Sequence, residues 1–283
     1  MMNDQFSIIN NKNVIKVYGR DHKQFLNNIL TNDINDFLEN EISCSALLSP
    51  QGKILFDLII FKSRSQNDGE FIYIECSKSQ IIELLKKLRL YSLRQDIYIE
   101  ETKLHVVVTN NLTKYKFTKS DRRFKNHNLG RIYPTDEELS NLLDKEHFSN
   151  TNWYNELKII KCIPEGDDDI PMNKIFPFEI NYFYDMGINF NKGCFIGQEV
   201  VARVKYKGKI NKQYHSFKIE NKEYLELKGK RILQKDIEIG LVINSFFLNE
   251  SILGFCILKQ KLITNDKKYI KDSENNLTIN IIL

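Results

Sequence analysis

Residues 191–208, NKGCFIGQEVVARVKYKG, combine a thiol, glycines and charged side chains in the pattern of a tight turn followed by a short helix. Cys194 would lie just before the N-terminus of this helix, two residues after Lys192. A helix N-terminus and a nearby ammonium group both favour the thiolate form of a cysteine. Cys194 is therefore a candidate nucleophile, metal ligand or redox switch, whereas an isolated free cysteine is usually a small buried hydrophobic residue.

The residues around Cys194 suit a closely packed helix start. Gly193 and Gly197 permit backbone conformations and close approaches that a β-carbon would obstruct. Gln198 and Glu199 can place polar groups at the first turn of the helix. Glu199 and Arg203 are four residues apart, so we expect them to pair on one helical face.

Asp57 is the second chemical signal, because it interrupts the apolar run KILFDLIIF at residues 53–61. Strand alternation places Leu55, Ile59 and Phe61 on its side and further apolar residues on the other side. Burying an unpaired carboxylate is costly, so Asp57 must meet a cation, backbone N–H groups or a ligand rich in N–H groups, such as a pterin. The alternative is a structural carboxylate that binds a nearby backbone turn.

A basic cluster follows the cysteine segment and consists of Lys205, Lys207, Lys209 and Lys212, with Tyr206 among them. Such a cluster could hold a polyglutamate tail, a phosphate or RNA, although a solvated face is the commoner structure. The net charge of +4 is only mildly basic. It accommodates an anionic ligand but does not indicate direct nucleic-acid binding.

The composition places the 283-residue chain among globular proteins of about two or three domains. No apolar run approaches the roughly 20 residues of a membrane helix, and the N-terminal residues lack the pattern of a signal peptide. We therefore expect a cytoplasmic protein with no membrane partner. The five cysteines are an odd number without a CxxC pair, so we expect free thiols and no metal site.

These residues need elements to position them, and the sequence predicts strands alternating with helices in its N-terminal part. A helix after Gly19 has Phe25, Leu26 and Ile29 on one face. A hairpin is predicted around Pro50-Gln51-Gly52. Short apolar runs from Tyr214 onward indicate an all-β terminal barrel or sandwich.

The segment KGCFIGQEVVAR resembles the signature of the YgfZ-type folate-binding proteins. These belong to the superfamily of the glycine-cleavage T-protein, an aminomethyltransferase, and their mitochondrial relatives assist iron–sulfur cluster assembly. The resemblance extends over GRDHKQFLNNILTNDI (19–34), LLSPQGKILFDL (47–58), LYSLRQDIYIE (90–100) and PFEINYFYDMGINFNKG (177–193). It therefore covers most of the chain outside residues 101–155.

The resemblance implies a T-protein-like α+β fold, with antiparallel-sheet domains and flanking helices around a central folate pocket, plus a C-terminal β-barrel. We expect the first part of the folate-binding domain at 1–101 and a reduced middle α+β domain at 102–155. Residues 156–212 would return to the folate-binding core and carry the KGCFIGQE motif. Residues 213–283 would form the barrel.

The resemblance also assigns roles to residues. Cys194 would be the functional thiol, and Asp57 is the counterpart of the aspartate that contacts folate in T-proteins. The remaining motif positions carried over as ligand-binding are Lys192, Gly193, Gly197, Gln198, Glu199 and Arg203. The expected cofactor is tetrahydrofolate or a one-carbon derivative. Lys161 and Cys162 depart from the family, whose members often have Arg and Gly there.

The implied function is that of a folate-binding accessory protein for iron–sulfur cluster assembly or repair. It would support enzymes such as radical tRNA-modifying proteins, and its partners would be the assembly machinery or client iron–sulfur enzymes. One alternative is an aminomethyltransferase that passes a one-carbon unit to tetrahydrofolate, with Asp57 positioning or deprotonating the folate amine. Another is an RNA-binding module that uses the lysine cluster.

Overall fold

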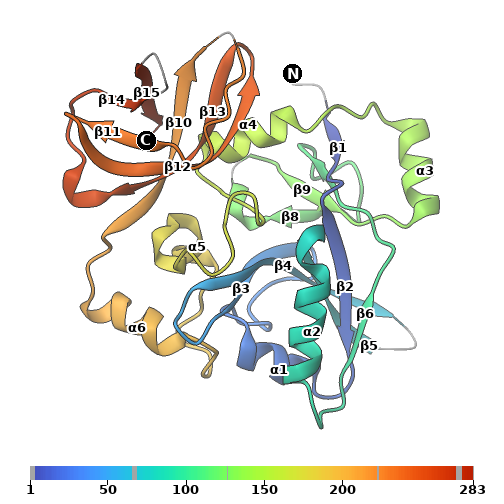
Figure 1. Ribbon diagram of the computed structural model, residues 1–283. Coiled ribbons are helices and arrows are strands. Elements are labelled where there is room, and N and C mark those ends of the chain that lie inside the picture. The colour runs from blue at the N-terminus through green and yellow to red at the C-terminus, as the bar shows by residue number, and fades with distance from the viewer. Residues whose placement is uncertain (1–3, 66–68, 126, 222, 272–275, 283) are drawn as a thin grey trace.

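The computed structural model describes residues 4–65, 69–125, 127–221, 223–271 and 276–282, which form a nine-stranded sheet with flanking helices and a separate closed barrel (Figure 1). The strand order in the sheet is β1-β7-β9-β8-β3-β4-β5-β2-β6. The strands are β1 (Phe6–Ile8), β2 (Lys12–Tyr18), β3 (Glu41–Leu48), β4 (Ile54–Ser65), β5 (Gly69–Ser77), β6 (Tyr98–Glu101), β7 (Val107–Thr109), β8 (Lys119–Asp121) and β9 (Gly130–Ile132).

The pairing between β3 and β8 is parallel, whereas the other neighbouring strands of the sheet pair antiparallel. Glu41 on β3 lies opposite Ser120 on β8 at this junction. The expected antiparallel units are therefore joined edge to edge into one mixed sheet.

Helices α1 (His22–Ile29) and α2 (Ile81–Tyr91) cover one face of strands β2 to β5 (Figure 1). Phe25 and Leu26 of α1 pack there with Phe56 and Leu58 of β4. The opposite face carries Ile59 and other apolar residues, which pack with the region of α4 (Asn152–Ile160). Strand β4 is thus covered on both faces, as its continuous apolar pattern predicts.

The structure has further helical elements besides α1, α2 and α4. They are α3 (Asp136–Lys145), α5 (Asn181–Met186), α6 (Gln198–Lys207) and the 3-10 turns η1 (Lys78–Gln80), η2 (Arg122–Phe124), η3 (Pro177–Glu179) and η4 (Gln260–Leu262). Helix α3 begins with a capping box, in which Thr135 and Glu138 each accept a backbone N–H of the other residue. No helix among the described residues is both long enough and apolar enough to span a membrane.

The C-terminal part forms a closed antiparallel barrel in the order β10-β13-β12-β11-β14-β15. Its strands are β10 (Lys212–Glu220), β11 (Arg231–Gln234), β12 (Ile237–Leu248), β13 (Ser251–Lys259), β14 (Lys268–Lys271) and β15 (Asn276–Ile282). Closure removes exposed strand edges, which stabilises a small all-β unit. The predicted α+β fold with a C-terminal barrel is confirmed.

Candidate functional site

Asp57 lies in the middle of β4 and is only 5% exposed. Its Oδ2 accepts the backbone N–H of Gly166 at 2.9 Å, across 109 residues of sequence. Its Oδ1 is buried and has no hydrogen-bond partner among the described residues. Burial raises the pKa of this carboxyl, against the opposing effects of Lys12 and the Gly166 N–H. The predicted buried carboxylate is thus half satisfied by the protein.

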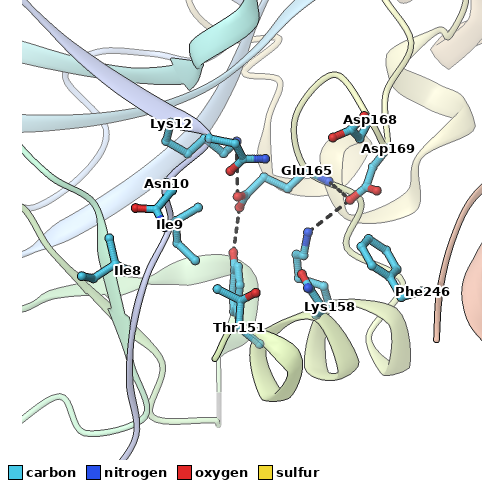
Figure 2. Close-up of a pocket in the computed structure, with 13 residues that line it drawn as sticks. Ile8, Ile9, Asn10, Lys12, Thr151, Lys158, Glu165, Asp168, Asp169 and Phe246 are labelled. Carbon is cyan, nitrogen blue, oxygen red and sulfur yellow. Dashed lines mark hydrogen bonds and ion pairs between the residues drawn. The ribbon is translucent and has the colours of Figure 1, made fainter. Parts of the chain in front are cut away.

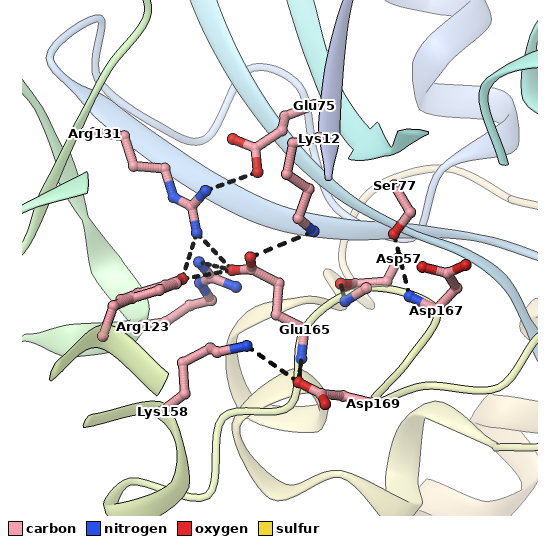
Figure 3. A network of polar contacts seen from close by, with 12 residues as sticks. Lys12, Asp57, Glu75, Ser77, Arg123, Arg131, Lys158, Glu165, Asp167 and Asp169 are labelled. Carbon is pink, nitrogen blue, oxygen red and sulfur yellow. Dashed lines mark hydrogen bonds and ion pairs between the residues drawn. The ribbon is translucent and has the colours of Figure 1, made fainter. Parts of the chain in front are cut away.

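Glu165, next to Gly166, lies at the centre of a buried network of charges (Figure 3). One oxygen lies 3.3 Å from the ammonium of Lys12, and the other lies within 2.7 Å of the guanidinium groups of Arg123 and Arg131. The Tyr154 hydroxyl donates to the same oxygen at 2.8 Å. Burial alone would raise the pKa of Glu165, but the three cations hold it well below its usual range.

Arg131 and Arg123 connect this centre to both halves of the mixed sheet. Arg131, on β9, is completely buried and donates to Glu75 on β5 at 2.7 Å. Arg123 donates to both oxygens of Asp121, at 3.0 and 2.7 Å. One Arg123 nitrogen, Nη1, is buried and has no hydrogen-bond partner among the described residues. The network therefore retains an unsatisfied acceptor on Asp57 and an unsatisfied donor on Arg123.

The strand register explains why these side chains converge. Glu75 lies opposite Val14 on β2 and Ile59 on β4, and Lys12 lies opposite Ser77. Because alternate residues share a face, Lys12, Glu75 and Asp57 project from three neighbouring strands toward the same side of the sheet.

Asp169 joins the network to the barrel. Its carboxylate accepts from the Lys158 ammonium at 3.2 Å, the Glu165 backbone N–H at 3.0 Å and the Asn244 amide of β12 at 2.8 Å. Its backbone carbonyl accepts from the Tyr214 hydroxyl of β10 at 2.9 Å. One buried residue thus ties helix α4, the loop after it and the barrel together.

A cavity of about 260 Å³ opens beside this network (Figure 2). It is lined by residues 8–12, by α4 residues including Tyr154 and Lys158, by Glu165, Asp168 and Asp169, and by Phe246 of the barrel. Asp57 does not line the cavity, but Lys12 and Glu165 do, and both also act on the pKa of Asp57. The cavity therefore lies between the N-terminal strands, helix α4, the loop after it and the barrel, and both acidic and basic side chains line it.

The cysteine motif lies elsewhere, in an exposed loop before α6. Cys194 is exposed and does not line the cavity beside the network. The ammonium of Lys192 donates to the backbone carbonyls of Asn27, Leu30 and Asn32. The Lys192 ammonium therefore binds the end of α1, whereas the sequence spacing suggested that it acts on the Cys194 thiol.

The two glycines of the cysteine motif, Gly193 and Gly197, have different surroundings. Gly197 has a φ of +79°, and a β-carbon there would lie 2.6 Å from the carbonyl oxygen of Ser49. Gly52, in the β3–β4 turn, has a φ of +80° and makes the reciprocal close approach to Val200. Gly193 faces open space. The expected close approach thus exists at Gly197 and not at Gly193.

The polar motif residues serve the start and the outer face of α6. Gln198 accepts the backbone N–H of Phe195 at 3.2 Å. Glu199 and Arg203 form the expected i,i+4 ion pair at 3.0 Å, with both side chains largely exposed. An exposed pair of this kind contributes little to stability. Neither residue lines the cavity beside Glu165.

Curated proteins of similar sequence indicate the family. No family model matches the chain. The iron-sulfur cluster assembly factor IBA57 homolog, mitochondrial, of Dictyostelium discoideum is 24% identical over 245 residues, which cover 72% of this chain and 60% of that protein. The mouse (Mus musculus) IBA57 factor is 25% identical over 244 residues, covering 81% and 68%, and the human (Homo sapiens) factor is 25% identical over 228 residues, covering 72% and 64%.

The chain is a homologue of the IBA57 assembly factors. It spans between 60% and 68% of the length of these three relatives. The crystal structure of glycine cleavage system aminomethyltransferase T from Bartonella henselae superposes with a TM-score of 0.77, covering 98% of this chain and 84% of that chain at 12% identity. The chain therefore has the T-protein fold that the sequence resemblance implied.

Cys162 occupies the backbone position after α4 that favours glycine. Its φ is +50°, and the N–H groups of Cys162 and Ile163 bond back to the carbonyls of Ile159 and Lys158. This is the hydrogen-bond pattern of a Schellman motif, whose left-handed residue is usually glycine. Cys162 therefore adopts a left-handed conformation that is strained for a residue with a β-carbon. Lys161, the other departure, is exposed.

Sequence reasoning missed most of the buried charge network. Glu75 interrupts the apolar run FIYIECS, the same signal that singled out Asp57. Arg131 follows Gly130 in a strand of three residues, which is too short to show a pattern. Glu165 lies in a loop, where a carboxylate is unremarkable in sequence. Only Glu75 had a signal that could have been recognised.

Proposed function

We propose that this protein is a folate-dependent factor for the assembly or repair of iron–sulfur clusters, in which Cys194 is the working thiol. The observation that carries the folate part is Asp57 Oδ1, a buried acceptor without a partner among the described residues at the centre of a T-protein fold. The similarity to the IBA57 factors supports the iron–sulfur part.

The residues near Asp57 fit the pterin part of tetrahydrofolate. A pterin offers several N–H donors, which suit an unsatisfied carboxylate oxygen. The cavity of about 260 Å³ is slightly below the range of about 300–1,000 Å³ for small-molecule pockets, so it suits the ring system better than a whole folate. Lys12 and Lys158 of the cavity lining would supply positive charge, and Asp57, which does not line the cavity, would accept from the ring once Lys12 and Glu165 make room for it. When bound, the folate would carry a one-carbon unit.

Cys194 suits chemistry at the surface better than the other described cysteines. Burial raises the pKa of Cys44 and Cys76 to about 12, and that of Cys162 to about 11, which keeps them as thiols. Cys194 is exposed. A single thiolate per chain could contribute one ligand to a cluster, so the remaining ligands would come from a partner or a second copy.

Two variants test the two parts of this proposal. Asp57→Asn should weaken tetrahydrofolate binding by roughly tenfold or more in titration calorimetry, because it replaces an acceptor by a group that cannot take the same N–H donors. Asp144→Asn, at an exposed position on α3, is the matched control and should bind as the wild type does. Equal affinity of all three proteins would contradict a folate site at Asp57.

The thiol is tested by complementation of a strain that lacks its own IBA57 homologue, with the activity of an endogenous iron–sulfur enzyme as the readout. Cys194→Ser should abolish complementation, because the hydroxyl is neither a comparable nucleophile nor a cluster ligand. Cys162→Gly, which relieves a positive φ, should complement fully. Full activity with Cys194→Ser would remove the thiol from the mechanism.

The fold favours aminomethyl transfer as the second candidate function. The test is to mix the protein with an aminomethyl-loaded lipoylated carrier protein and tetrahydrofolate, and to follow ammonia and methylenetetrahydrofolate. Turnover that falls with Asp57→Asn would make the protein a transferase. RNA binding by the lysine cluster is the weakest candidate, and undetectable tRNA binding at low salt would exclude it.

A further inference from the structure

Lys192 is bound to the segment that ends helix α1. Its Nζ donates to the carbonyl oxygens of Asn27 at 2.7 Å, Leu30 at 2.5 Å and Asn32 at 2.9 Å. Asn27 lies in the last turn of α1, where carbonyls lack intrahelical partners and form the negative end of the helix dipole, and Leu30 and Asn32 directly follow the helix. An ammonium group with three donors satisfies this cluster of acceptors.

The chain before Lys192 is attached to the same segment by other hydrogen bonds. The Asn189 N–H donates to the Thr31 carbonyl at 3.0 Å, and the Thr31 hydroxyl donates to the Gly187 carbonyl at 2.7 Å. The buried Asn32 amide donates to the Met186 carbonyl at 2.8 Å. Lys192 is thus the last of a series of contacts that hold residues 186–192 against residues 27–32.

The chain after Cys194 is fixed by packing. Phe195 is 6% exposed and packs in the core cluster below the barrel. Gly197 lies against the β3–β4 turn. Cys194 is therefore an exposed residue between two anchored points, and Gly193 beside it has no neighbouring atoms that would restrict it.

We propose that Lys192 is a positioning residue, which presents Cys194 at the surface by anchoring the preceding loop to the end of α1. This rests on the proposed function, in which Cys194 is the working thiol. It replaces two roles suggested by the sequence, namely lowering the thiol pKa by charge and contacting the folate. The ammonium is committed to three neutral carbonyl oxygens, and Lys192 does not line the cavity beside Asp57.

The test compares Lys192→Met, Lys192→Arg and the control Lys174→Met, which removes an exposed charge elsewhere. The first measurement is the alkylation rate of Cys194 against pH, with the labelled peptide identified by mass spectrometry. The second is amide hydrogen exchange along the chain. The third is iron–sulfur enzyme activity in the complemented strain.

Lys192→Met should leave the pH dependence of Cys194 alkylation unchanged, because the Lys192 ammonium is engaged with three backbone carbonyl oxygens of the α1 segment. Amide exchange should rise by roughly tenfold or more in residues 189–195 while exchange in the sheet and barrel stays the same, since hydrogen bonds to a charged group are lost locally. Enzyme activity should fall. Lys192→Arg should restore slow amide exchange and enzyme activity only in part. A planar guanidinium cannot donate to three carbonyl oxygens in the geometry of a compact ammonium.

An upward shift of the alkylation midpoint in Lys192→Met, reversed in Lys192→Arg, would overturn the proposal in favour of activation by charge. Unchanged exchange in residues 189–195 would overturn it as well. Neither readout depends on iron–sulfur activity. Failure of the proposed function would appear separately, as full complementation by Cys194→Ser.

Discussion

Asp57 shows how a single buried carboxyl group can lower the stability of the folded protein. Burial raises its pKa in the folded protein above the ordinary value of 3.8. Between pH 3.8 and the raised pKa of Asp57 in the folded protein, the folded state binds more protons than the unfolded state. The free energy of unfolding therefore falls as pH rises through this range, and above it the ionised carboxylate remains a cost.

We expect Asp57→Asn to be at least as stable as the wild type near neutral pH, although it binds folate more weakly. The amide cannot ionise, so the loss of stability as pH rises above 3.8 should be smaller in the variant. Urea unfolding from about pH 4 to pH 8 measures this difference, with Asp144→Asn as the control. A variant that is clearly less stable at every pH would show that the carboxylate is mainly structural.

Helix α6 is placed by the contact between two glycines from distant elements. Gly197 begins the helix at a positive φ and touches the β3–β4 turn, where Gly52 also has a positive φ. The contact determines how the helix and the preceding cysteine loop approach strand β3. The positive φ of Gly197 and its contact with the β3–β4 turn therefore place the cysteine motif. The amphipathic pattern of α6 contributes as well.

Gly197→Ala should destabilise the protein by about 2 kcal/mol, because the new β-carbon would meet the Ser49 carbonyl and the residue would keep a left-handed conformation. Gly193→Ala is the matched control, since a β-carbon there meets open space, and its effect should stay within about 0.5 kcal/mol. Denaturant unfolding gives both values. Similar stabilities for the two variants would show that the turn adjusts without cost.

The whole molecule depends on charged contacts between parts that are distant in sequence. Arg131 connects β9 to β5 and to the loop containing Glu165, and Asp169 connects that loop to α4 and the barrel. Removing one partner of such a buried pair strongly destabilises the protein, because the other charge is then buried without compensation. Several of these residues, among them Lys158, Glu165 and Asp169, also line the cavity.

Asp169→Asn should lower the free energy of unfolding by about 3 kcal/mol, because it leaves the Lys158 ammonium buried without its carboxylate. Asp168→Asn is the control, since its pair with Lys228 is exposed and its effect should remain below about 1 kcal/mol. Unfolding followed separately by signals from the barrel and the sheet would show whether the two parts lose their coupling. Equal effects of the two substitutions would argue against Asp169 as the connecting residue.

Features that depend on local pattern were predictable from the sequence. The face of α1 follows from the spacing of Phe25, Leu26 and Ile29, and the hairpin follows from Pro50-Gln51-Gly52. The short apolar runs predicted an all-β C-terminal unit, either a barrel or a sandwich, and the structure has a closed barrel. The apolar surroundings of Asp57 predicted a buried carboxylate in need of a partner, because the cost of burying a charge does not depend on the rest of the fold.

The tertiary structure alone decided which residues meet. Gly166 reaches Asp57 across 109 positions, and Lys192 reaches Leu30 across 162, so no spacing rule connects either pair. The parallel pairing of β3 with β8, the convergence of Arg131 on Glu165 and the distance of Cys194 from the cavity arise in the same way. Periodicity reports which face of an element is buried, whereas the packing of whole elements determines which charged groups share a desolvated space.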